Sequence, residues 1–284
     1  MTEQWVTEFW SNGFGVIRNV FGEDEVAALR EACEAPAIVR EQLQRRSAEK
    51  VTHVMEATVR SPRFADVAVD DRLTEPLSRL IGNDIQLLHS KLTSKPLKAE
   101  RGYFPWHQDL PFWVHTNTDL VAACIAIDPL TEENGCLRMI PGSHKWGLLD
   151  HTSEGFFAGH CEALAQVMDA TAQAVPLVLA PGDVSFHHCL TIHGSNENVA
   201  GRPRRMLTLQ YRAADAFQLN GDIYLDTGRV VRGRYRGTVR CTEGTITLPR
   251  RREIGYEAGY GGSWRQAGGH AWALNTIEGR LYDE

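Results

Sequence analysis

The chain lacks the features that mark several large classes of protein. Its six cysteines are scattered over 284 residues and form no CxxC pair, which argues against a thiolate zinc site and fits reduced thiols in a cytosol. No apolar run approaches the ~18 residues of a membrane span. The polar start "MTEQWVTEFW" is not a secretory signal, and the end "RLYDE" carries no peroxisomal tripeptide. The sequence therefore predicts a cytoplasmic protein that does not act in a membrane.

Positive charge is also scarce. The chain has 30 Lys and Arg against 36 Asp and Glu, a net charge of −6. This balance lacks the excess of positive charge that is typical of proteins that bind nucleic acid. Over residues 1–216 the ratio is 20 to 28, and such an acidic excess favours a cationic or amine-bearing small molecule through its field.

The sequence does show a change in predicted secondary structure near residue 84. Residues 1–35 predict a helix, a short strand and a second helix, and residues 36–80 are mostly helical and loop-like. From residue 84 short β-rich runs follow one another, separated by Gly, Pro, Asn and Asp. Several short strands without long helices between them indicate a sandwich or barrel.

Two further segments differ from these strands. The polar, partly helical stretch 148–174 is a candidate lid. Residues 217–284 hold 12 of the 25 glycines, 10 Arg and no Lys. This composition has too few apolar residues for a second core, so we expect loops and short strands packed on the main domain.

The stretch "FPWHQDLPFW" places a histidine and an aspartate two residues apart in an aromatic setting. In an extended strand His107 and Asp109 project to the same side, while Gln108 faces away. Burying an unpaired carboxylate is costly. A shared metal ion and a simple hydrogen-bonded pair are the two explanations.

A second histidine-rich stretch, "HHCLTIHGSNENVAGRPRR", offers a third ligand. Two His and one carboxylate make the facial triad that suits non-haem Fe(II). His187, His188 and His193 all compete for the distal position.

An oxygenase of this type needs a cation for a cosubstrate carboxylate, and Arg pairs a carboxylate with two parallel hydrogen bonds. Arg204 lies eleven residues after His193. In "RRMLTLQYR" it shares a face with Met206, Thr208 and Gln210, which predicts a polar cavity wall opposite an apolar face. Arg202 and Arg205 are the competing candidates.

Taken together, several pieces of the sequence resemble one family. The pieces are "FWSNGFGVI", "LLHSKLTSKP", "WHQD", "LTEENGCLRMIPGSH", "PGDVSFHH" and "IHGSNENVAGRPR". The chain resembles the phytanoyl-CoA dioxygenase family of Fe(II)/2-oxoglutarate oxygenases, which includes ectoine hydroxylase. The likeness runs from about residue 5 to 212.

This resemblance implies a fold, mostly β with flanking helices and built on a double-stranded β-helix (a cupin-like jelly roll). We expect one oxygenase domain over residues 1–284. Residues 1–83 would form an N-terminal helical and strand support, 84–216 the jelly-roll core and 217–284 a Gly- and Arg-rich C-terminal extension.

The resemblance also implies residue roles. His107, Asp109 and His193 would bind Fe(II), and Arg204 would pair with the C5 carboxylate of 2-oxoglutarate. Eleven residues after His187 and His188 stand Asn198 and Val199, which cannot pair with a carboxylate, so this spacing also favours His193. The remaining expected cosubstrate contacts are Ser195, Thr93, Phe104 and Trp113.

The function that follows is oxidation of a small polar metabolite or biosynthetic intermediate with O2, releasing succinate and CO2. Because Asp109 is retained, we expect oxygenation without halogenation. Two alternatives stay open at this point, a zinc hydrolase on the same scaffold and an inactive ligand-binding homologue. Phytanoyl-CoA and ectoine themselves are disfavoured as substrates, since no basic cluster for CoA is evident and the longer ectoine signature ends after Asp109. The sequence predicts no particular oligomeric state.

Overall fold

Two antiparallel sheets form the centre of the molecule. The structure is a computed structural model that describes residues 3–44, 52–95 and 102–248. The larger sheet has seven strands in the order β1-β10-β5-β12-β3-β13, with β2 also paired to β3. The smaller sheet has four strands in the order β4-β11-β6-β9.

The strands of the larger sheet are β1 (Phe14–Ile17), β2 (Thr52–Met55), β3 (Ile85–Lys95), β5 (Leu120–Ala126), β10 (Val184–His188), β12 (Arg204–Ala213) and β13 (Val230–Arg232). Those of the smaller sheet are β4 (Phe104–His107), β6 (Leu137–Met139), β9 (Val175–Pro176) and β11 (His193–Ser195). A separate hairpin pairs β7 (Thr152–Ser153) with β8 (Phe156–Phe157).

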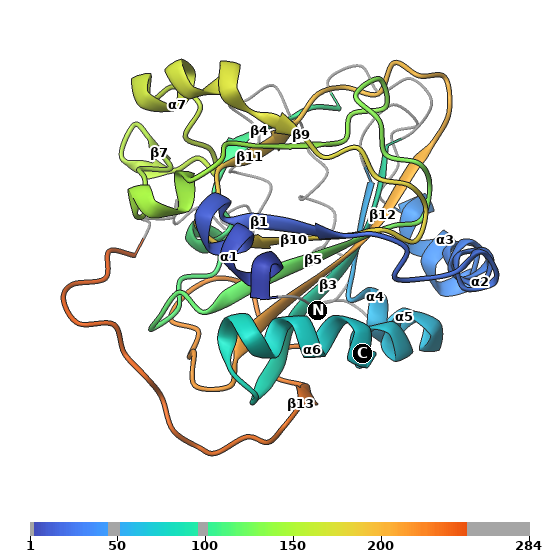
Figure 1. Cartoon of the computed structure of the whole chain (residues 1–284), viewed down its shortest axis with the longest axis horizontal. Helices are drawn as coiled ribbons and strands as arrows, with labels where there is room; N and C mark the ends of the chain where they lie inside the picture. The colour runs from blue at the N-terminus through green and yellow to red at the C-terminus, as the bar shows by residue number, and fades with distance from the viewer. Residues whose placement is uncertain (1–2, 45–51, 96–101, 249–284) are drawn as a thin grey trace.

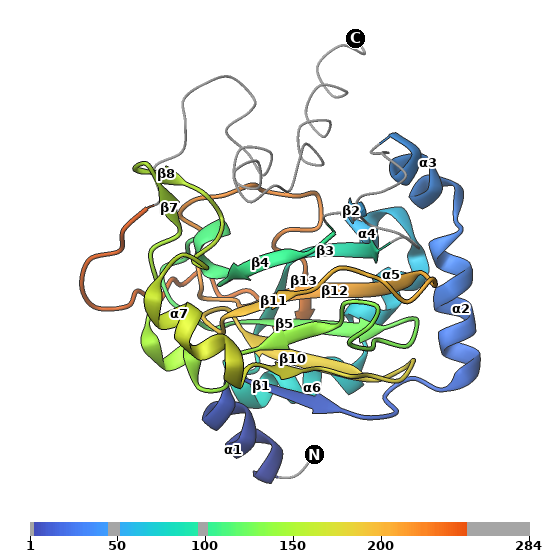
Figure 2. The ribbon, with the colours of Figure 1, turned by 90° about the horizontal axis from the view of Figure 1, so that it is seen from above.

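The helices are α1 (Glu3–Asn12), α2 (Glu23–Cys33), α3 (Pro36–Gln44), α4 (Ala57–Arg60), α5 (Pro62–Ala68), α6 (Asp71–Ile81) and α7 (Ala165–Ala170), with 3-10 turns η1 (Leu110–Phe112), η2 (Ser143–Trp146) and η3 (Thr171–Gln173). Helices α4, α5 and α6 lie against the face of the larger sheet that points away from the smaller sheet (Figure 1). In the view from above, α7 and α2 flank the strands at opposite ends (Figure 2).

The helix α6 shows why these segments form helices. The side chain of Asp70 caps its start by accepting a hydrogen bond from the backbone N–H of Arg72 at 2.8 Å. Leu73, Leu77 and Leu80 repeat at helical spacing and are buried in the main core cluster. The helix therefore covers the sheet with its apolar face.

The alternation predicted for residues 204–211 is confirmed. Leu207, Leu209 and Tyr211 belong to the core between the larger sheet and the helices. Their neighbours Met206 and Thr208 point the other way, into a cavity between the two sheets. The two-sheet architecture is the predicted jelly roll.

The N-terminal third contains more strand than the sequence indicated. Strands β1 and β2 both join the larger sheet, β1 beside β10 and β2 beside β3. The predicted strand at 13–17 is thus confirmed, whereas β2 falls in a region that the sequence assigned to helices and loops. Because β2 is only four residues long, it is too short for periodicity to reveal.

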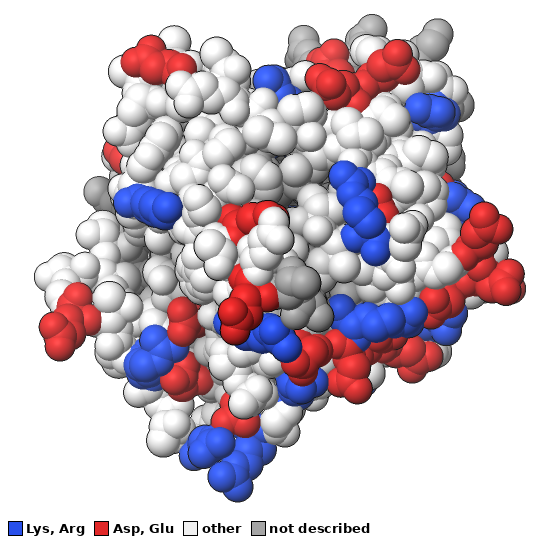
Figure 3. Space-filling view, in the orientation of Figure 1, with Lys and Arg blue, Asp and Glu red and all other residues white. Residues whose placement is uncertain are grey.

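Both charge signs are interspersed on the face seen in Figure 3, without a large patch of one sign. No helix among the described residues is long and apolar enough to cross a bilayer. Part of the predicted C-terminal extension, residues 249–284, lies outside the described residues. The predicted division into support, core and extension stays a prediction.

Candidate functional site

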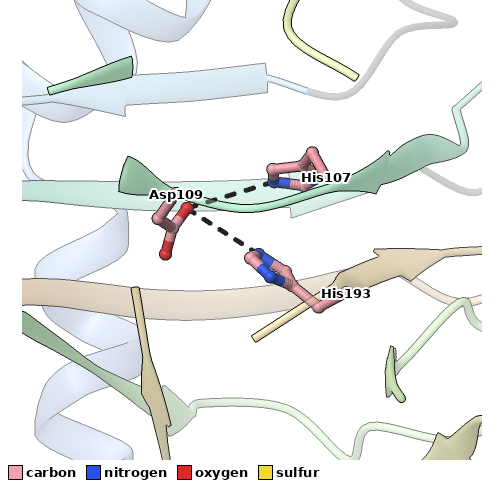
Figure 4. Close-up of side chains that lie close together, drawn as sticks. All are labelled: His107, Asp109 and His193. Carbon is pink, nitrogen blue, oxygen red and sulfur yellow. Dashed lines mark ion pairs between the residues drawn. The ribbon is translucent and has the colours of Figure 1, made fainter. Parts of the chain in front are cut away.

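His107, Asp109 and His193 meet between the two sheets (Figure 4). His107 ends β4 and His193 begins β11, and the two residues are direct partners in the antiparallel register. The Nε2 atoms of His107 and His193 lie 4.0 and 3.8 Å from Oδ1 of Asp109. One ligand atom from each of the three residues lies within 4.8 Å of the others. All three side chains are buried.

The two imidazoles are held in the tautomer that a metal ion requires. Nδ1 of His107 lies 2.7 Å from the carbonyl oxygen of Pro105, and Nδ1 of His193 lies 3.0 Å from that of Thr191. A carbonyl only accepts hydrogen bonds, so each Nδ1 carries the proton and each Nε2 offers its lone pair to the site. Burial lowers the pKa of His107, and it lowers that of His193 to about 4, so both rings are neutral at physiological pH.

The carboxylate of Asp109 is held in its orientation by hydrogen bonds to Oδ2. Its Oδ2 accepts hydrogen bonds from Nε2 of Gln210 at 2.7 Å and from Nε2 of His187 at 3.0 Å. These two donors occupy Oδ2 and leave Oδ1 directed at the imidazoles. Such outer hydrogen bonds are typical of metal-ligating carboxylates.

The three candidate histidines differ in the direction in which each side chain points. His187 faces the interior but lies behind Asp109 as its hydrogen-bond partner. His188, the next residue on β10, points to the opposite side and packs against Trp10 and His144. The only cluster of metal-ligand type found among the described residues contains His193.

The local structure at Asp109 differs from the expected strand. Strand β4 ends at His107, and Asp109 has helical backbone angles at the start of η1. Gln108 still faces away, because its amide donates to the carbonyls of Gly147 and Leu190 and accepts from the N–H of Leu149. His107 and Asp109 are therefore brought together by a turn after the strand and not by strand alternation.

Arg204 lines the same cavity as His107, Asp109 and His193. Its side chain is fully buried, and none of its three guanidinium nitrogens has a hydrogen-bond partner among the described residues. Burial lowers its pKa to about 10, so it remains charged. A buried unpaired cation is costly, so this arrangement indicates a site for an anionic ligand.

The two other candidates for the cosubstrate cation, Arg205 and Arg202, do not line this cavity. Arg205 points outward and binds Asp128 and Glu34. Arg202 lies in an exposed loop. Arg204 is therefore the one of the three that faces the cavity.

The other expected cosubstrate contacts are divided. Thr93 and Phe104 line the cavity. Trp113 is not among the residues that line it, and after the η1 turn its ring packs against His89 at a centroid distance of 4.3 Å, so its contact with the cosubstrate stays a prediction. Ser195 is not among the cavity-lining residues either, and its Oγ accepts a hydrogen bond of 2.7 Å from Lys95. Because a hydroxyl can also donate, its contact with the cosubstrate stays a prediction.

Sequence reasoning missed two lysines on β3. Lys95 is fully buried behind Ser195 and lies 5.3 Å from the ring centroid of Phe104. Lys91 lines the cavity itself. Both share strand parity with Thr93, so the pattern "KLTSK" held the signal, since lysines at alternate positions of a buried strand must face a polar interior.

The sequence of this chain matches a known protein family and known proteins. The family model described as "Phytanoyl-CoA dioxygenase (PhyH)" matches residues 9–206. A probable alpha-ketoglutarate-dependent hypophosphite dioxygenase of Stutzerimonas stutzeri is 31% identical over 264 residues, covering 85% of this chain and 90% of that protein. The ectoine dioxygenase of Sphingopyxis alaskensis is 28% identical over 232 residues, covering 72% and 74%.

Solved structures share the fold. The iron-bound EctD structure from S. alaskensis has a TM-score of 0.65 at 24% identity and covers 84% of this chain and 87% of that one. The alpha-ketoglutarate-dependent carbocyclase SnoK from nogalamycin biosynthesis has a TM-score of 0.64 at 24% identity, covering 83% and 95%.

Proposed function

The chain belongs to the phytanoyl-CoA dioxygenase family, and from this premise we propose that it oxidises a small polar metabolite at the His107–Asp109–His193 centre. It is an Fe(II)- and 2-oxoglutarate-dependent dioxygenase, the activity common to this family and to the relatives that it matches. The relatives named above act on small molecules, hypophosphite and ectoine.

The donor set fits Fe(II). Two neutral imidazole nitrogens and one carboxylate oxygen lie within 4.8 Å of one another, and a metal ion held by such a donor set would keep positions open for cosubstrate, O2 and substrate. The absence of a thiolate ligand keeps the site compatible with an iron that changes oxidation state. When bound, iron with 2-oxoglutarate supplies the oxidation, in which O2 is consumed, succinate and CO2 are released and the substrate gains an oxygen atom.

The protein's own residues bind and orient the reactants. Arg204 pairs with the C5 carboxylate of 2-oxoglutarate, and Thr93 and Phe104 line the space beside it. Leu137 of the smaller sheet and Met206 of the larger sheet contribute apolar side chains to the cavity wall. His187 and Gln210 keep Oδ1 of Asp109 directed at the metal.

The observation that carries the proposal is the unpaired, buried guanidinium of Arg204 in the same cavity as the triad. A zinc hydrolase has no use for a carboxylate clamp at this place. A binding protein without turnover has no need of two imidazoles in a metal-ready tautomer beside an oriented carboxylate.

The test is an anaerobic titration of the Fe(II)-loaded protein with 2-oxoglutarate. We expect the metal-to-ligand charge-transfer band of a bidentate 2-oxoglutarate complex, followed by succinate formation when O2 is admitted. Absence of the band in the intact, iron-loaded protein would overturn the proposal.

A further inference from the structure

Lys91 is a cation in the active-site cavity to which the established reaction gives no role. It lies in the middle of β3, where it pairs in register with Thr208 on β12 and with Met55 on β2. It lines the same cavity as His107, Asp109 and His193. The structure gives its ammonium no hydrogen bond or ion pair to any described residue.

The position of Lys91 in this cavity puts its charge on the path of the substrate. A substrate must enter the cavity to reach the metal site that His107, Asp109 and His193 would form, and Lys91 lines the same cavity.

Lys91 cannot share the cosubstrate end held by Arg204. In the β3–β12 register Lys91 stands opposite Thr208, and Arg204 stands opposite Lys95. The two cations are thus four residues apart along the strands, which is about 13 Å at the usual rise per residue. Arg204 marks one end of the cavity and Lys91 the other.

The balance of charge leaves Lys91 uncompensated. Asp109 is the only carboxylate among the described residues that line the cavity. With iron and 2-oxoglutarate bound, the divalent metal and Arg204 together match the charge of Asp109 and of the cosubstrate dianion. Of the Lys and Arg side chains that line the cavity, Lys91 is the one left without a matching negative charge, and it is only partly buried and so is reachable by a ligand.

We propose that Lys91 binds an anionic group of the substrate, so that the substrates of this enzyme are small molecules that carry a carboxylate, a phosphonate or a similar oxyanion. This inference rests on the proposed function, because it assumes that 2-oxoglutarate occupies the Arg204 end. It reverses the sign expected from the acidic excess of the sequence. On the face shown in Figure 3 the acidic side chains lie among cations, whereas the sign of the charge at the cavity is set by the residues that line it.

The experiment measures binding to the anaerobic complex with Fe(II) and saturating 2-oxoglutarate. The probes are acetate, methylphosphonate and hypophosphite, with acetamide and ethylammonium as uncharged and cationic probes of similar size. Binding is followed by calorimetry and by the shift of the charge-transfer band, and neither readout needs turnover. We expect the anions to bind at least about tenfold more tightly than acetamide, since a hydrogen bond to a charged group outweighs a neutral one.

Three variants locate the binding site. Lys91→Met should weaken anion binding by roughly ten- to a hundred-fold, and Lys91→Arg should restore most of it. Lys145→Met removes an exposed lysine on η2, outside the cavity, and should bind the anions as the parent does. Thermal melts of each variant confirm that it is folded.

The outcomes separate the two proposals. If the parent shows no charge-transfer band with 2-oxoglutarate, the proposed function fails. If the band is present but acetamide or ethylammonium binds as well as acetate, the assignment of an anionic substrate is wrong. Anion binding that is unchanged in folded Lys91→Met, or lost in Lys91→Arg as fully as in Lys91→Met, also overturns it.

Discussion

The side chain of Arg204 has opposite effects on the stability of the ligand-free protein and on ligand binding. A fully buried guanidinium without a partner destabilises the ligand-free fold. Truncating one partner of a buried charge pair costs ~2–5 kcal/mol, so Arg204→Ala should weaken 2-oxoglutarate binding by roughly thirty-fold or more. Arg204→Lys should recover part of the affinity, because it restores the charge but not the planar fork.

Arg205→Ala and Arg202→Ala are the matched controls for Arg204. Arg205 binds Asp128 on the outer side of the sheet and Arg202 lies in an exposed loop. Both variants should bind 2-oxoglutarate like the parent in the anaerobic titration, while Arg205→Ala loses some stability. Unchanged affinity in Arg204→Ala would remove the main support for the cosubstrate site.

The histidines should fall into three classes when each is replaced by Ala. His107→Ala and His193→Ala each remove a proposed metal ligand and should abolish Fe(II) binding. His187→Ala removes a hydrogen bond to Asp109 and should weaken Fe(II) binding by roughly 10–100-fold. His188→Ala should keep iron, because this ring points away from the site. Metal analysis after gel filtration distinguishes the classes, and loss of iron in His188→Ala with retention in His193→Ala would contradict the assignment.

Asp109 bears on the reaction outcome. A metal site that retains its carboxylate has no vacated position for chloride, so we expect oxygenated and not chlorinated products. Product mass spectra recorded in chloride buffer measure this directly. A chlorinated main product would show that Oδ1 of Asp109 does not occupy its position during turnover.

At the scale of elements, the side chains of β12 point alternately into the core, where they stabilise the fold, and into the cavity, where they can contact ligands. Leu209 lies in the core between the sheet and the helices, and its neighbours Thr208 and Gln210 face the cavity. Leu209→Ala should lower the free energy of unfolding by ~2–5 kcal/mol with little change in 2-oxoglutarate affinity. Urea unfolding and the anaerobic titration, run on the same preparation, test both halves of the expectation. A large loss of affinity in a folded Leu209→Ala protein would mean that the two faces are coupled.

Asp183 ties two elements together and makes stability depend on pH. It lies just before β10 and accepts hydrogen bonds from the N–H groups of Asn19 and Ala180 and from the guanidinium of Arg18. Burial raises the pKa of this carboxyl, but the three hydrogen bonds outweigh it and lower the pKa below the ordinary value of 3.8. The stabilisation is therefore fully present above that value and is lost as the pH falls towards the folded-state pKa.

Asp183→Asn should accordingly lower the free energy of unfolding by about 1–3 kcal/mol at pH 7. The difference from the parent should shrink as the pH falls through 4 towards 3. Urea unfolding of both proteins across this range measures it. A difference that stays constant with pH would mean that the ionised carboxylate is not what the hydrogen bonds stabilise.

At the scale of the whole molecule, ligand binding should stabilise the fold in a fixed order. Fe(II) at a hundred times its Kd should add about 2.7 kcal/mol, which for a chain of this size corresponds to a rise in Tm of roughly 5–10 °C. 2-Oxoglutarate should add to this only when the metal is present, since iron holds its other end. Anaerobic thermal melts with and without chelator measure the effect, with His193→Ala as the control. Full stabilisation of His193→Ala by Fe(II) would place the metal elsewhere.

The sequence by itself determined much of this protein because its signals are local. Strand alternation placed Arg204, Met206, Thr208 and Gln210 on one face, which the structure confirms. The HxD motif and the motifs shared with the family indicated the reaction and the jelly roll. Such signals need only neighbouring residues or a fixed spacing, so they can be read from a single chain.

Only the tertiary structure decided what depends on distant residues meeting. His187 and His193 are six positions apart and both face the interior, but Oδ2 of Asp109 is bound to His187 while Oδ1 faces His193. Trp113 carried the same aromatic signal as Phe104, yet the η1 turn directs it to His89. The place of Lys91 at one end of the cavity and of Arg204 at the other follows from the β3–β12 register. That register is set by which faces of two strands are buried together, and neither strand's sequence specifies it alone.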